Sequence, residues 1–171
     1  MFRLSKITDY GIVILAEMAQ RSLTADTGES SKAAPSLNAR ELASHVELPL
    51  PVVSKVLKAL TRANILESQR GTKGGYSLAR EPEELSVAEM IAALDGPLAL
   101  TQCSQGPAIC DLEATCSVRN PWLVINHVVQ NSLAGITLAD LTSPVFSGQL
   151  APLTDLAGLG RPEDSVSERQ G

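Results

Sequence analysis

The segment between residues 38 and 80 constrains the fold more than any other part of the chain. Asn38 followed by Glu41 has the pattern of a capping box, which predicts a short helix through Val46. A second helix is expected over residues 50–63, where apolar residues recur at helical spacing. The apolar stripe of this second helix consists of Val53, Val56, Leu57 and Leu60. Two short helices separated by a few residues predict a helix-turn-helix.

A short basic hairpin is expected directly after the second helix. Residues 65–68 (ILES) and 76–78 (YSL) have the composition of strands, and the sequence RGTKGG between them is a Gly-rich basic turn. A hairpin in this position is the wing of a winged helix. We therefore predict a mainly α fold with a small β wing, in which residues 1–80 form a winged helix-turn-helix DNA-binding domain.

One long helix and one loop complete the N-terminal half. Apolar residues recur at helical spacing after Ser5, which is expected to cap the start of the first helix. They are Ile7, Tyr10, Ile14 and Met18. Residues 24–37 are small, polar and aperiodic, and they predict a long surface loop.

The second half of the chain is expected to hold two helices. Ser86 with Glu89 predicts a connecting helix, which Gly96-Pro97 ends. Asn120-Pro121 opens a long helix that has apolar residues on more than one side. These residues are Trp122, Val124, Ile125, Val128, Val129 and Leu133. Such a helix needs more than one apolar partner, and we expect the second partner to be another subunit.

The chain is accordingly divided into four parts. After the DNA-binding domain, residues 81–120 hold the connecting helix and a cysteine-containing loop. Residues 121–143 form the dimerisation helix region. Residues 144–171 are rich in Pro, Gly, Ser and charge, and we expect them to be a disordered tail.

The net charge of −5 conceals an uneven distribution. Residues 1–80 hold 11 Lys and Arg against 7 Asp and Glu, whereas residues 81–171 hold 3 against 12. This division indicates a nucleic-acid binder whose second part has another purpose, the alternative being a chance division. No apolar run approaches the roughly 18 residues that span a bilayer. The charged start MFRLSKITDY does not resemble a signal peptide, so we expect a cytoplasmic protein without a membrane partner.

The helix over residues 50–63 is expected to enter the major groove of DNA. Its candidate contacts are Ser54, Lys55, Lys58 and Arg62, the last reaching phosphate. Arg70, at the base of the Gly-rich hairpin, is the candidate for the minor groove. Lys73, at the hairpin tip, is expected to contact phosphate.

All three cysteines of the chain lie in one segment with the spacing C-x6-C-x5-C. They are Cys103, Cys110 and Cys116. An odd number of clustered thiols in a reducing compartment indicates metal or redox chemistry. Thiolates select zinc, Cu(I) or iron–sulfur clusters, and the absence of a close C-x2–4-C pair favours a cluster.

Three thiols leave one ligand position open. From the residues alone, the candidates for it are His127, Asp111, Glu113 and a group from elsewhere, with His45 a poor candidate. A metal-independent thiol redox switch is the alternative to a cluster. The sequence has no CxxC pair, nucleophile–base pair or cofactor loop, so we expect neither an enzyme nor a small-molecule substrate.

Together these segments resemble the Rrf-type winged-helix regulators, which include IscR-like iron–sulfur sensors and NsrR-like nitric oxide sensors. The resemblance rests on MFRLSKITDYGIVIL, RELASHVELPLPVVSKVLKALTRANIL, RGTKGGYSLAR and the cysteine loop, and covers about residues 1–142. The run TKGGYSLAREPEELSVAEMIAALDGPLALTQC is most similar to the branch that regulates the SUF cluster-assembly operon. The resemblance implies a homodimeric repressor that binds operator DNA and carries a [2Fe-2S] or [4Fe-4S] cluster.

The resemblance also implies roles for individual residues. The three cysteines match the family's cluster ligands, with a first spacing one residue longer than the common form. Arg119 stands where IscR-like members have a histidine. Asp9 stands where NsrR-like members have an aspartate that ligates the partner's cluster, so the resemblance makes Asp9 the fourth ligand. Ser54-Lys55 replaces the Glu-Gln pair of IscR-like proteins, and Arg70 matches the family's minor-groove arginine.

Overall fold

The computed structural model describes residues 4–25, 36–71 and 74–144, and these contain helices with one small sheet. Its α-helices are α1 (Lys6–Ala25), α2 (Ala39–His45), α3 (Leu50–Arg62), α4 (Val87–Asp95), α5 (Arg119–Ala134) and α6 (Leu138–Thr142). Its strands are β1 (Leu66–Gln69) and β2 (Gly75–Leu78), and its short 3-10 helices are η1 (Pro82–Glu84) and η2 (Gln102–Ser104). The predicted loop at 24–37 and the predicted tail at 144–171 lie almost wholly outside the described residues.

The two predicted helices of the helix-turn-helix are present as α2 and α3. Asn38 accepts hydrogen bonds from the backbone of Arg40 and Glu41, while the Glu41 side chain accepts from the backbone of Asn38. This reciprocal capping box begins α2 at the predicted place. The turn between the helices contains Glu47 in a left-handed conformation, with φ 53°. The predicted apolar stripe of α3 is buried throughout, as Val53, Val56, Leu57 and Leu60.

The wing is a two-stranded antiparallel hairpin. β1 pairs with β2 in the register Leu66 opposite Leu78 and Gln69 opposite Gly75. Leu37 forms an additional bridge to Tyr76, so the segment before α2 runs beside the wing. A Cβ on Gly75 would lie only 2.7 Å from the carbonyl oxygen of Leu37, which explains a glycine at this close approach.

The hydrophobic core lies where α1, α3 and α4 meet. As predicted, Ile14 and Met18 of α1 face inward, and the Ser5 hydroxyl caps the helix start by accepting from the backbone of Thr8. The side chains with almost no exposed surface are Ile14, Leu15, Leu42, Val53, Val56, Leu57, Leu60, Ile65, Leu66, Leu85, Met90 and Leu138. The mainly α fold with a β wing is therefore confirmed.

The short helix α6 was not predicted from the sequence. Thr137 and Asp140 form a capping box that begins it, and Leu138 at its start is fully buried. The backbone of Val87 donates to Ile136, and that of Leu138 donates to Leu85. These bonds place α6 against α1 and η1, so a segment near residue 140 completes the core of the N-terminal domain.

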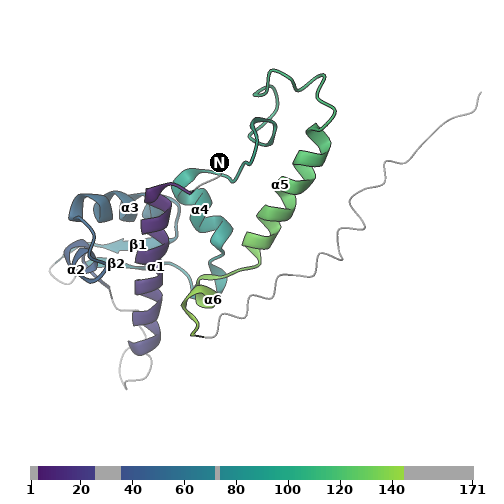
Figure 1. Cartoon of the computed structure of the whole chain (residues 1–171). Helices are drawn as coiled ribbons and strands as arrows, with labels where there is room; N and C mark the ends of the chain where they lie inside the picture. The colour runs from purple at the N-terminus through teal and green to yellow at the C-terminus, as the bar shows by residue number, and fades with distance from the viewer. Residues whose placement is uncertain (1–3, 26–35, 72–73, 145–171) are drawn as a thin grey trace, which may run out of the picture.

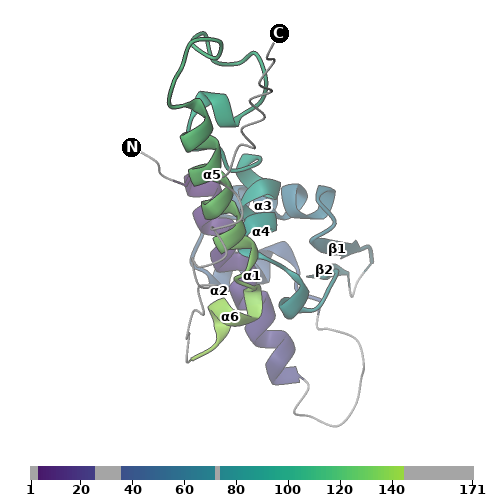
Figure 2. The ribbon, with the colours of Figure 1, turned by 90° about the vertical axis from the view of Figure 1, so that its right-hand side faces the viewer.

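Helix α5 extends away from the winged-helix domain and carries the cysteine-containing segment at its far end (Figures 1 and 2). It begins at Arg119, one residue before the predicted Asn120. Several of its apolar side chains are exposed in the single chain, among them Trp122 at 39%, Val124 at 43% and Ile125 at 44%. None of the helices in the described residues has the length and apolar content that crossing a lipid bilayer requires.

Candidate DNA interface and cysteine loop

The outer face of α3 carries the predicted DNA contacts. Lys55, Lys58 and Arg62 are exposed and follow one another at helical spacing, opposite the buried stripe. Ser54 is half-buried beside them. A helix whose one face packs on the core and whose other face carries three cations is suited to the major groove of DNA.

The wing carries a further cation, directly after the strand β1 that packs against this helix. Arg70 is exposed at the end of β1, and Gly71 follows it with φ 119°, a conformation that favours glycine. Lys73 lies outside the described residues. Arg40, exposed on the first turn of α2, is a cation that our sequence analysis did not single out. The sequence could have indicated Arg40, because the first helix of a helix-turn-helix crosses the DNA backbone.

The cysteine loop, defined as residues 101–118, begins at η2. Its three thiols are free and partly exposed. The Oγ1 atom of Thr101 lies 3.1 Å from Sγ of Cys103 and 2.9 Å from the hydroxyl of Ser104. The Cys103 thiol is therefore held against Thr101, whose hydroxyl also contacts Ser104.

Successive turns connect Cys110 and Cys116 to the start of α5. The backbone of Glu113 donates to Cys110, that of Cys116 donates to Leu112, and that of Arg119 donates to Cys116. The Glu113 carboxylate spans the loop, because it accepts from the backbone of Ala108 at 2.6 Å and from Nη2 of Arg119 at 2.8 Å. Glu113 thus holds together the residues on either side of the last two cysteines.

The single chain does not bring the predicted metal ligands together. Among the described residues, no three His, Cys, Asp or Glu side chains lie close enough to hold a metal ion. His127 is exposed and its Nε2 atom lies 3.0 Å from the Asn131 amide, one turn further along α5. Asp9 and Asp111 are exposed. Glu113 is engaged by Arg119 and Ala108, so it is not a free carboxylate.

The linker, residues 96–100 between α4 and the cysteine loop, is fixed to α5 by amide side chains. Asn126, only 6% exposed, accepts from the backbone of Leu100 at 2.9 Å and donates to the carbonyl of Leu98 at 3.3 Å. Gln130 donates to the same carbonyl at 2.8 Å. Cys103 follows three residues later, so these bonds connect its loop firmly to the long helix. Sequence reasoning missed this contact because its partners are 26 or more residues apart.

Asp95 joins the end of α4 to the beginning of α1. Its carboxylate accepts a hydrogen bond from the backbone of Ser5 at 3.0 Å. Burial raises the pKa of Asp95, but hydrogen bonds from Ser5 and Thr8 outweigh this effect and hold the pKa below its usual value. α1 packs in turn against α3, so the cysteine loop is connected to the DNA-binding helix through the linker, α4 and α1.

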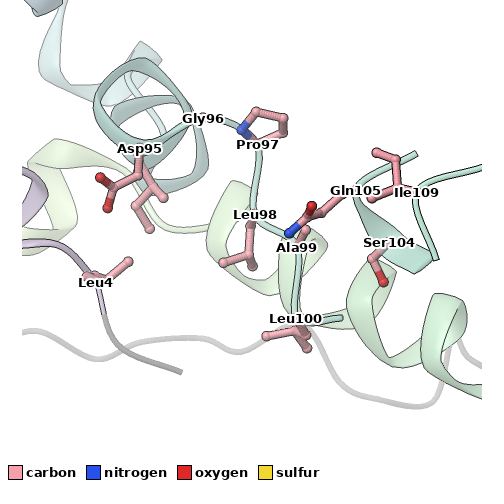
Figure 3. A pocket seen from close by; sticks show the side chains of 11 residues that line it. Leu4, Asp95, Gly96, Pro97, Leu98, Ala99, Leu100, Ser104, Gln105 and Ile109 are labelled. Carbon is pink, nitrogen blue, oxygen red and sulfur yellow. The ribbon is translucent and has the colours of Figure 1, made fainter. Parts of the chain in front are cut away.

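A cavity of about 730 Å³ lies beside this connection (Figure 3). Its walls come from the segment before α1, the end of α4, the linker and the cysteine loop. The side chains labelled in the figure include Leu4, Asp95, Leu98, Ser104 and Ile109. The cavity is therefore lined both by residues of the cysteine loop and by residues of the N-terminal domain.

The donors of the cysteine loop fit a cluster of iron and sulfide. Three free thiols are the ligands that such clusters take. In addition, Nε of Arg119 is buried without a hydrogen-bond partner, and no other buried side-chain nitrogen or oxygen in the described residues lacks one. An unpaired cationic donor three residues after Cys116 suits a negatively charged sulfur group.

The exposed cations of α3 and the adjacent hairpin define a winged-helix DNA-binding protein. The family model Rrf2, described as an iron-dependent transcriptional regulator, matches residues 4–144. The chain belongs to this family. The predicted resemblance is thereby confirmed at the level of the family, and so is the expectation that the protein is not an enzyme.

Relatives and solved structures agree with this assignment. The chain is 31% identical over 150 residues to slr0846 of Synechocystis sp., itself an inferred HTH-type transcriptional regulator; the match covers 87% of this chain and 93% of the relative. It is similar in structure to CymR (YrzC), the global cysteine regulator of B. subtilis, with TM-score 0.62, 25% identity and coverage of 85% and 99%. T. potens IscR shares the fold, with TM-score 0.59, 22% identity and coverage of 99% and 94%.

Proposed function

We propose that this transcriptional regulator is a homodimeric repressor whose DNA binding depends on an iron–sulfur cluster held by Cys103, Cys110 and Cys116. The observation that carries the proposal is the cysteine loop, which contains three free thiols and is followed by Arg119, whose buried Nε atom has no hydrogen-bond partner. The cluster would supply a group that oxidation, nitric oxide or iron starvation destroys. The family description as iron-dependent supports this reading.

The DNA interface is proposed to consist of α3 and the wing. Lys55 is expected to donate to a base edge, with Ser54 beside it, while Lys58 and Arg62 contact phosphate. Arg70 is expected to enter the minor groove, and Lys73 to contact phosphate. A homodimer presents two such surfaces to two half-sites, one helical turn or a multiple of it apart.

The apolar side chains of α5 support the dimer. Trp122, Val124 and Ile125 are 39–44% exposed in the single chain, an unfavourable state for large apolar groups. A second copy of α5 would cover them. The dimer would also allow Asp9 of one subunit to complete the cluster site of the other, which the single chain leaves one ligand short.

The route from cluster to DNA is proposed to run through contacts within one chain. Asn126 fixes the linker to α5, and Asp95 at the C-terminal end of α4, directly before the linker, holds the start of α1. A change in the cysteine loop that moves the linker would therefore move α1 against α3. Coupling between two sites of this kind typically amounts to about 1–3 kcal/mol. The regulated genes are proposed to be those of SUF cluster assembly.

A metal-independent thiol switch is the second candidate. It is favoured by the partial exposure of all three thiols, which leaves them open to oxidants. The similarity to CymR, named as a global cysteine regulator and solved in an oxidized form from Staphylococcus aureus, supports it as well. In this case disulfide or sulfenate formation, rather than loss of a cluster, would change DNA affinity.

The deciding experiment measures cluster content and DNA affinity on anaerobically purified protein. Iron, sulfide and the visible spectrum are compared for wild type, Cys110→Ala and the three candidate fourth-ligand variants Asp9→Ala, His127→Ala and Asp111→Ala. DNA sites are first selected from a random pool by the wild-type protein. We expect Cys110→Ala to lose the chromophore but keep its helical content. Asp9→Ala should keep the chromophore but lose it faster in air, since a carboxylate is a weaker ligand.

Other outcomes would overturn the proposal in defined ways. A colourless wild-type protein whose DNA affinity changes on thiol oxidation would establish the thiol switch. If only His127→Ala loses cluster stability, the fourth ligand is His127 and not Asp9. Selected sites with no relation to the promoters of cluster-assembly genes would remove the SUF assignment but leave the sensor function intact.

A further inference from the structure

Arg119 is the only lysine or arginine in residues 81–144, a region that contains eight Asp and Glu. It follows Cys116 by three residues and begins α5. The first turn of a helix already carries partial positive charge from the aligned peptide dipoles. Positive charge in the second half of the described chain is therefore concentrated at the C-terminal end of the cysteine loop.

The contacts of Arg119 use only part of its guanidinium. Its Nη2 atom donates to Oε1 of Glu113 at 2.8 Å, and its side chain is 32% exposed. Its Nε atom is buried and has no hydrogen-bond partner among the described residues. A guanidinium has donors and no acceptor, so the missing partner must be an acceptor.

Sulfur is the acceptor that the position of Arg119 favours, because its backbone donates to Cys116 and its side chain pairs with Glu113 between the last two cysteines. Cys103, Cys110 and Cys116 become anionic when they bind a metal or cluster, and a cluster adds inorganic sulfide. Hydrogen bonds to these sulfurs, together with net charge, set the reduction potential of a cluster. A guanidinium cannot itself ligate iron, because it offers no lone pair.

We propose that Arg119 is the charge-setting residue of the cysteine loop: Nε donates to a sulfur held by the three cysteines, while Nη2 remains on Glu113. It is a positioning residue and not a ligand. The cluster part of this inference rests on the proposed function, whereas the effect on the thiols does not. Glu113 opposes Arg119, because its carboxylate neutralises part of the guanidinium charge.

The first test measures the electrostatic potential at the thiols of the reduced, metal-free full chain. At low ionic strength, alkylation rates are compared for iodoacetate, which is anionic, and iodoacetamide, which is neutral. We expect Arg119→Gln to lower the ratio of the iodoacetate rate to the iodoacetamide rate on the order of threefold. This is the factor that one unit charge about 6 Å away produces in water. Arg119→Lys should retain the ratio and Glu113→Gln should raise it.

Arg80→Gln is the matched control, since Arg80 also pairs with one glutamate, Glu89, at 3.0 Å. Its ratio should equal that of the wild type. An unchanged ratio in Arg119→Gln would overturn the proposal and leave water as the partner of Nε. An equal decrease of the alkylation ratio in Glu113→Gln and Arg119→Gln would also overturn the proposal. Both variants would then act only by breaking the ion pair between Glu113 and Arg119.

The second test measures the reduction potential of the anaerobically reconstituted protein. With iron content unchanged, Arg119→Gln should disfavour the reduced cluster about tenfold, a shift of about 59 mV for one electron. Glu113→Gln should shift the potential in the opposite direction. Equal loss of iron from Arg119→Gln and Arg119→Lys would overturn the proposed tuning role. A wild-type protein that takes up no iron would refute the proposed function, while the alkylation ratio would still decide the role of Arg119.

Discussion

Asp95 shows how a single carboxylate connects the two functional regions. It accepts from the backbone of Ser5 and has a pKa below its ordinary value of 3.8. A carboxyl group with a lowered folded-state pKa stabilises the folded state above its ordinary pKa, and this contribution is lost as pH falls through the lowered value. The tie between α4 and α1 is therefore expected to weaken in acid.

We predict that Asp95→Asn lowers the free energy of unfolding near neutral pH. Its difference from wild type should shrink below the ordinary pKa and disappear below the lowered folded-state pKa. Urea unfolding at a series of pH values provides the measurement. Asp111→Asn, at an exposed position of the cysteine loop, is the control for the loss of one negative charge. The same pH-dependent loss in the control would attribute the effect to overall charge.

Residues that act through neighbours in sequence were predictable, and residues that act across the fold were not. The pair Asn38 and Glu41 predicts a helix start because both residues lie within one helical turn. Asn126 and Asp95 bond to partners 26 and 90 positions away, so no local pattern reveals them. Arg119 was noted only as a departure from the family pattern, and its buried Nε atom became visible in the structure.

At the scale of elements, α6 is short but closes the core. Leu138 is fully buried between α1 and η1, whereas Leu141 on the same helix is 38% exposed. Large-to-small substitution of a buried leucine removes its transfer free energy and leaves a cavity. We predict that Leu138→Ala destabilises the protein by about 2–5 kcal/mol. Thermal unfolding of Leu138→Ala and Leu141→Ala compares the two positions; an equal loss in both would contradict the assigned role of α6.

The elements that the sequence predicted are those with strong periodicity or caps. α3 and α4 began within one residue of their predicted starts, since both have clear first turns. α6 has a similar cap at Thr137, but its five residues provide too few apolar positions for a periodic pattern. Its importance arises from packing against α1, which lies more than 110 positions earlier in the chain.

At the scale of the whole molecule, we propose that a second copy of the chain covers the exposed apolar face of α5. We predict that Ile125→Glu yields a monomer, because a charge would be buried at the centre of the proposed interface. Asn131→Glu, at an exposed polar position of the same helix, should remain dimeric. Sedimentation equilibrium distinguishes the two. A wild-type monomer at micromolar concentration, or a dimeric Ile125→Glu, would refute the dimer through α5.

The packing of α6 against α1 also determines when the molecule becomes complete during synthesis. Leu138 must leave the ribosome before the N-terminal core can close, although α2, α3 and the wing emerge far earlier. By then the segment with all three cysteines has already emerged. A nascent chain therefore exposes its thiols to the cell before its DNA-binding domain is finished, so the chemistry of the loop has the opportunity to act first. Contacts this distant in sequence also slow folding, because long loops must close before they form.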